Sequence, residues 1–87
     1  MAITDETKTI WENHLMNELS VAGLTVAQRG VLAVDVVKHI DIEGGPQFVY
    51  IPNLSNIIRR ATGGLSYQVN RILEEFIHDA EHGNIFG

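Results

Sequence analysis

Apolar residues recur at helical spacing in the last third of the chain. Steps of three and four residues place six of them on one stripe of a helix: Val69, Ile72, Leu73, Phe76, Ile77 and Ala80. Gly63 and Gly64 can adopt the positive φ that ends a preceding helix, and Ser66 stands where an N-cap belongs. Residues 57–76 therefore predict two helices joined by a glycine turn, with Tyr67, Gln68, Asn70 and Arg71 facing outward.

The upstream sequence predicts two further helices. The first runs from about Asp5 to Ala22, and the second opens with a capping box formed by Thr25 and Gln28. Apolar residues then dominate residues 31–42, on a face too wide for one side of a surface helix. A second copy of the chain is the simplest cover. We therefore predict a homodimer interface that includes Val34, Val37 and Ile40.

Residues 47–51 alternate in the manner of a short strand, which begins after Gly44 and Gly45 and stops at Pro52. A lone strand leaves backbone groups without hydrogen bonds, and the same strand of a second subunit would satisfy them. Phe48, Val49 and Ile51 therefore join the predicted dimer interface. A solvated, extended linker is the alternative interpretation.

These elements predict a mainly α fold in two regions. Residues 1–52 would form a helical dimerisation region with its strand at 47–51, and residues 53–87 a helix-turn-helix region with a C-terminal helix. A chain of 87 residues makes one small domain whose core alone is marginal. The absence of cysteine excludes a disulfide scaffold, and no apolar run approaches the length of a membrane span. We expect a cytoplasmic protein that does not engage a membrane.

The formal net charge is −5, which is unusual for a nucleic-acid binder. Residues 53–73, however, contain Arg59, Arg60 and Arg71 and no acid. A small basic patch therefore survives inside an acidic protein. A solvated face with no binding role is the alternative interpretation of these arginines.

The run A-T-G-G-L-S-Y-Q-V-N-R-I-L, residues 61–73, resembles the helix-turn-helix of many bacterial regulators. In this interpretation Tyr67, Gln68, Asn70 and Arg71 face base edges in the major groove of double-stranded DNA. Arg59 and Arg60 would hold phosphates and set the register. A general αα-hairpin without DNA-binding activity would give the same pattern.

A second resemblance covers roughly residues 14–52. Glu18-Leu19-Ser20 with Gly23, the run V-K-H-I at residues 37–40, and G-G-x-Q-x-x-Y-I-P at residues 44–52 are similar to the Mor family of phage middle-operon transcription activators. The resemblance implies a dimer built by the amino-terminal part and its strand, and a DNA-reading carboxy-terminal part. It further implies that Gln47 and Tyr50 face the DNA between the two heads. We also consider RNA polymerase or another protein as a partner.

Two other functions compete with DNA binding. His78, Glu81 and His82 match the H-x-x-E-H pattern of zinc proteases, yet a catalytic site needs a third ligand and a walled pocket, so we expect no enzyme, metal or cofactor. The acidity outside the basic patch suggests instead a small phage protein that binds and inhibits or adapts a host or phage protein. The leading prediction is a homodimeric DNA-binding regulator of phage or prophage type.

Overall fold

The computed structural model describes residues 3–85, which form four α-helices, three short 3-10 turns and no strand. The helices are α1 (Asp5–Glu18), α2 (Val26–Glu43), α3 (Leu54–Thr62) and α4 (Tyr67–Glu81). The 3-10 turns span Leu19–Val21, Pro46–Phe48 and Ile51–Asn53. The predicted mainly α class is confirmed. Within the described residues, no helix combines the length and apolar character needed to cross a bilayer.

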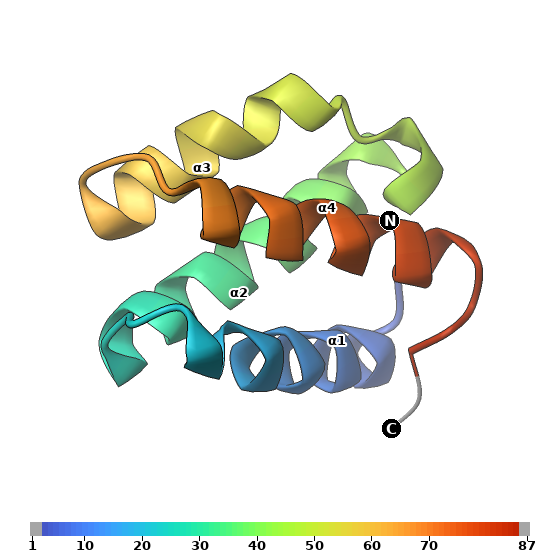
Figure 1. Cartoon of the computed structure of the whole chain (residues 1–87). Coiled ribbons are helices and arrows are strands. Elements are labelled where there is room, and N and C mark those ends of the chain that lie inside the picture. Colours follow the sequence, from blue (N-terminus) through green and yellow to red (C-terminus); the bar gives the residue numbers. More distant parts are fainter. Residues whose placement is uncertain (1–2, 86–87) are drawn as a thin grey trace.

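The helices form a closed ring, because each packs on the next and α4 returns to α1 (Figure 1). The return contact is aromatic: the rings of Trp11 and Phe76 meet edge to face, with centroids 6.2 Å apart. Such a pair adds about 0.5–1.5 kcal/mol beyond the area it buries. The C-terminal helix is thereby fixed against the N-terminal one.

Local capping explains where α2 begins and ends. The Thr25 hydroxyl accepts from the backbone N–H of Gln28 at 3.1 Å, and the Gln28 side chain accepts from the backbone N–H of Thr25 at 3.0 Å. This is the predicted capping box, and it satisfies two donors that the first turn would leave free. The helix ends at Gly44, whose φ of 95° no other residue type adopts readily.

α2 is the central helix, since its inner stripe is fully buried between α1 and α3. Val37 and Ile40 belong to this stripe and have no exposed surface. They therefore cannot contact a second chain without unfolding the first, and the prediction that placed them in a dimer interface is wrong. Val34 lies on the opposite face and is 47% exposed. The wide apolar face of α2 is shared between the core and the surface.

The predicted strand at 47–51 is also wrong. Two 3-10 turns occupy this part of the chain, with N–H donations from Phe48 to Gly45, from Val49 to Pro46 and from Asn53 to Tyr50. Only Val49 and Tyr50, between the turns, have extended backbone. Because local hydrogen bonds satisfy much of this backbone, a partner strand is not required.

One hydrophobic core serves both halves of the chain. Residues on either side of the expected boundary at 52/53 belong to the same buried cluster, from Ile3 to Ile77. The Cα radius of gyration is 11.6 Å, close to the roughly 12 Å of a single compact domain of this length. The two regions are therefore segments of one folded unit.

Candidate nucleic-acid interface

The turn between α3 and α4 follows the sequence prediction closely. Gly63 ends α3 with φ of 81°, and its N–H donates to the Arg59 carbonyl at 2.8 Å. The Ser66 hydroxyl accepts from the Val69 N–H at 3.3 Å and caps α4. Gly64 does not have positive φ, so only the first glycine of the pair is needed for its backbone conformation.

The buried stripe of α4 turns the predicted reading face outward. Val69, Leu73 and Phe76 have no exposed surface, whereas Tyr67 is 81% exposed. Gln68 and Arg71 are exposed as well, and Asn70 is half-buried. The polar first turn of α4 is accessible, as the spacing predicted.

Three of these four side chains already have partners within the chain. The Gln68 amide donates to the Val21 carbonyl at 3.4 Å, and the Asn70 amide donates to the Glu74 carboxylate at 2.8 Å. Arg71 Nε lies 3.5 Å from Glu75 Oε1, in a pair whose side chains are both mostly exposed. An exposed helical pair of this kind contributes only about 0.3–0.5 kcal/mol. A ligand could displace these partners at little cost.

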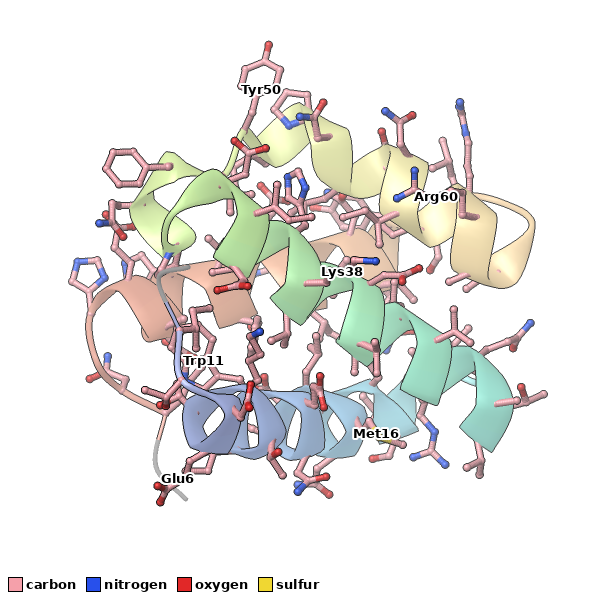
Figure 2. The ribbon with its side chains drawn as sticks, turned by 180° about the vertical axis from the view of Figure 1, so that it is seen from behind. Glu6, Trp11, Met16, Lys38, Tyr50 and Arg60 are labelled. Carbon is pink, nitrogen blue, oxygen red and sulfur yellow. The ribbon has the colours of Figure 1, made fainter. Side chains whose placement is uncertain are left out.

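Arg59 and Arg60 lie on different faces of α3. Arg60 lines a hollow of about 300 Å³ against α2, together with Asp35, Lys38 and His39. In Figure 2 Arg60 and Lys38 both lie on this back face. Arg59 is one helical turn from Ser55, which lies on the α4 side of α3. The two arginines are therefore not arranged as a pair.

Charge is divided between two parts of the molecule. Residues 44–73 carry three arginines and no acid, whereas the rest of the chain carries three basic and eleven acidic residues. The acid-free segment comprises two 3-10 turns, α3, the Gly63 turn and the start of α4. In Figure 1 the 3-10 turns and α3 form the upper edge of the molecule, and the Gly63 turn leads down to the start of α4. We call this segment the acid-free edge.

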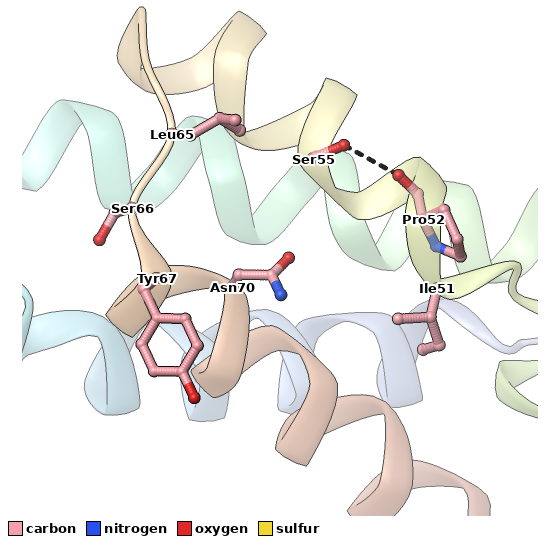
Figure 3. A pocket seen from close by; sticks show the side chains of 7 residues that line it. All are labelled: Ile51, Pro52, Ser55, Leu65, Ser66, Tyr67 and Asn70. Atoms are coloured by element: carbon pink, nitrogen blue, oxygen red, sulfur yellow. Dashed lines mark hydrogen bonds between the residues drawn. The ribbon is translucent and has the colours of Figure 1, made fainter.

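A cleft between α3 and α4 opens on this edge, and the sequence did not reveal it. Its volume is about 480 Å³, and its lining is mostly apolar: Ile51, Pro52, Ser55, Leu65, Ser66, Tyr67 and Asn70. Figure 3 shows Asn70 on α4 facing the wall formed by Pro52 and Ser55. Leu65 is 58% exposed although leucine favours burial. The sequence signal that could have indicated the cleft was an apolar residue, Leu65, in a turn.

Gln47 and Tyr50 belong to the acid-free edge but do not lie on a strand. Tyr50 is 66% exposed and projects from the turn region in Figure 2. Gln47 is exposed, and its side chain folds over Gly45. Among the remaining predicted interface residues, Phe48 and Ile51 are exposed while Val49 packs partly against the core.

A polar cluster joins α1 to α4 on the acidic side. His14 Nε2 lies 3.3 Å from Glu18 Oε1. Burial raises the pKa of Glu18, as do the nearby charges of Asp79 and Glu75, while His14 opposes the rise. The carboxylate of Glu18 is thus held in an unfavourable environment at neutral pH.

The histidines of the H-x-x-E-H motif stack on one another. The rings of His78 and His82 lie with centroids 4.3 Å apart, and His82 Nδ1 is 2.8 Å from the His78 carbonyl. Within residues 3–85, no three side chains of the metal-binding types gather around one point. The pair therefore does not form a zinc site with a third ligand in this arrangement.

Comparisons with protein-family models, with curated proteins and with solved structures found no match. The resemblance to the Mor family, and the function it implies, stay predictions.

Proposed function

We propose that the chain binds duplex DNA through the corner formed by α3, the Gly63 turn and the first turn of α4. The observation that carries the proposal is the acid-free edge, because residues 44–73 contain no acid and place Arg59 and Arg71 on α3 and the first turns of α4. In a protein of net charge −5 this edge is the surface that a polyanion can approach.

The first turn of α4 would enter the major groove. Its free N–H groups and helix dipole favour a nearby phosphate, and Asn70 and Gln68 offer the paired donor and acceptor that adenine recognises. Arg71 would pair with guanine after leaving Glu75. Arg59 lies on the α4 side of α3, so it would bind a backbone phosphate when the first turn of α4 is in the groove.

One such head has few cationic groups, so its affinity would be weak and sensitive to salt. Two copies acting on one duplex would overcome this weakness. A paired DNA-binding head of this size fits the regulation of transcription, and the Mor resemblance points to phage or prophage genes.

Titration of labelled random-sequence duplex at several salt concentrations tests the role of Arg59. Arg59→Ala should weaken binding to all sequences and lower the slope of log affinity against log salt by about 0.9 for each phosphate that is no longer neutralised. Arg60→Ala is the matched control, because it removes the same charge from the α2 side of the same helix. Equal slopes for Arg59→Ala and the parent protein would remove Arg59 from the interface.

Selection of binding sites from a random pool tests base recognition. Arg71→Ala should relax the preference at one base pair, corresponding to a decrease in discrimination of about 1–3 kcal/mol. Glu75→Gln, which frees Arg71 and removes a negative charge, should instead tighten binding. An unchanged site preference for Arg71→Ala would count against its assignment.

The α3–α4 cleft favours a second candidate, an acidic adaptor or inhibitor that binds another protein. An apolar cleft with exposed Leu65 and Tyr67 is typical of a protein-binding surface. A mobility-shift experiment with random duplex at low ionic strength distinguishes the two candidate functions. The DNA-binding protein should retain non-specific binding, whereas the adaptor should show none.

A further inference from the structure

The outer face of α2 carries exposed apolar residues that no other described helix covers. Val31, Val34 and Ile42 are 50%, 47% and 68% exposed, and the charged residues Asp35 and Lys38 lie among them. Figure 2 shows α2 crossing the front of the molecule with Lys38 upon it, and with α1 and α3 on either side. Among the described residues, neither Asp35 nor Lys38 has an ion pair within 4 Å.

This face is complementary to itself. When two identical helices pack antiparallel about a two-fold axis, the residues facing one another have position numbers with a constant sum. The register that sets Asp35 opposite Lys38 also sets Val31 opposite Ile42, because each pair of neighbours on the helix is separated by four residues. The axis then passes midway between Asp35 and Lys38, and Val34 lies between the two layers, opposite His39 of the other copy.

Charge selects this register over its neighbours. Sliding the helices so that Val34 meets Ile42 would also match apolar residues, but it brings Lys38 against its own copy. Sliding them the other way brings Asp35 against its own copy. Both alternatives place like charges against one another, which disfavours them.

We propose that two copies of the chain associate through the outer faces of α2, antiparallel, with Asp35 of each copy paired to Lys38 of the other. A partner of unrelated sequence would have no reason to match the order apolar, acidic, basic, apolar that runs along this face. A second copy matches it by symmetry.

The arrangement has a geometric consequence for the acid-free edge. The two-fold axis of an antiparallel pair lies in the plane between the two α2 helices, at a right angle to both. Within each copy, α1 and α3 flank α2 on opposite sides. Rotation about that axis therefore keeps both α3 helices on one side of the pair and both α1 helices on the other. The two acid-free edges would face in the same direction, so the inference supplies the pairing that the proposed function needs.

Charge exchange tests the pairing by sedimentation equilibrium in the absence of DNA. The parent chain should be a dimer, and Asp35→Lys and Lys38→Asp should each weaken dimerisation at least about tenfold, because like charges then oppose at two symmetric positions. An equimolar mixture of the two variants should recover the dimer, since one carries lysine at both positions and the other aspartate at both. Circular dichroism should show that both single variants remain folded.

Leu65→Glu is the control, because it places a charge in the α3–α4 cleft and should leave the dimer intact. A monomeric parent at about 100 μM, single variants that dimerise like the parent, or a mixture that stays monomeric would each overturn the proposal. Since no DNA is present, these results are independent of the duplex titration. Either proposal can fail while the other holds.

Discussion

The turn from α1 to α2 and the turn from α3 to α4 end in nearly the same residues, G-L-T at positions 23–25 and G-L-S at 64–66. Each has one glycine with positive φ, at Gly23 and Gly63, and each ends in a hydroxyl N-cap. The second turn has one more glycine, Gly64. Leu24 packs partly against the core, whereas Leu65 is 58% exposed and lines the cleft.

The two corners differ by Gly64 and also by the 3-10 turn Leu19–Val21, which precedes the first corner alone, and only the first corner is closed by its leucine. In the first turn the leucine helps to hold the helices together, and in the second it is displaced to the surface beside Tyr67. The corner without a leucine packed against the core is the one with the candidate interface. Exposed apolar side chains at loops on a rigid framework are common features of binding surfaces.

Truncating the two leucines should give the largest difference between the turns. Leu24→Ala should lower the free energy of unfolding by about 1–2 kcal/mol, below the roughly 2–5 kcal/mol of a fully buried leucine because Leu24 is only partly buried. Leu65→Ala should change it by less than about 0.5 kcal/mol. Urea denaturation followed by circular dichroism measures both. Equal decreases would show that the two leucines have the same environment.

The two glycines of the second turn provide a matched pair of substitutions. A Cβ would meet no atom within 4 Å at either position, so only the backbone distinguishes them. Gly63→Ala should lower the free energy of unfolding by about 1 kcal/mol, because its φ of 81° is unfavourable for an L-residue. Gly64→Ala should be neutral or slightly stabilising, since it restricts the unfolded chain. The reverse order of stabilities would contradict the backbone assignment.

The N-caps should differ by less. Thr25→Ala removes the hydroxyl of a reciprocal capping box and should destabilise by about 1 kcal/mol, while Ser66→Ala removes one longer hydrogen bond of 3.3 Å and should destabilise by about 0.5 kcal/mol. Thr9→Ala is the control, because its hydroxyl bonds only to a carbonyl within α1. Thermal unfolding of the three variants under one set of conditions ranks these contributions. A larger destabilisation by Thr9→Ala than by Thr25→Ala would reject the capping assignment.

The same comparison shows what the sequence could predict. The caps at Thr25 and Ser66 and the glycine ends of α2 and α3 depend on neighbouring residues, so their patterns predicted these boundaries correctly. The predicted end of the first helix at Ala22 is wrong, because α1 ends at Glu18 and a 3-10 turn follows it. The pairs Asn70–Glu74 and Arg71–Glu75 also follow from spacing alone and could have been anticipated. These are local properties of the chain.

The errors concern packing between distant residues. Val37 and Ile40 have the same apolar character as Val34, and only the positions of α1 and α3 decide which of them is covered. The five-residue alternation at 47–51 is too short to distinguish a strand from 3-10 turns that begin at Pro46. The cleft depends on how α3 crosses α4, which no local pattern records.

The helices that precede the two turns also end differently, in a way that pH should reveal. α1 ends in the acid Glu18, where the helix dipole disfavours negative charge, whereas the last turn of α3 holds Arg59 and Arg60. Burial, the largest cause, raises the pKa of Glu18 above its ordinary value of 4.5. An acid with a raised pKa in the folded state lowers stability when ionised, and this penalty is absent at pH values below the ordinary pKa.

Glu18→Gln should therefore raise the melting temperature slightly at neutral pH. The difference from the parent should shrink as the pH falls through the folded-state pKa and should vanish below about 4.5, where Glu18 is protonated in both states. Glu43→Gln is the control, because Glu43 ends α2 in the same way but is exposed. A stabilisation by Glu18→Gln that persists unchanged at pH 4 would mean that the carboxylate charge is not its cause, and a larger effect for Glu43→Gln would assign it to the helix dipole rather than to burial.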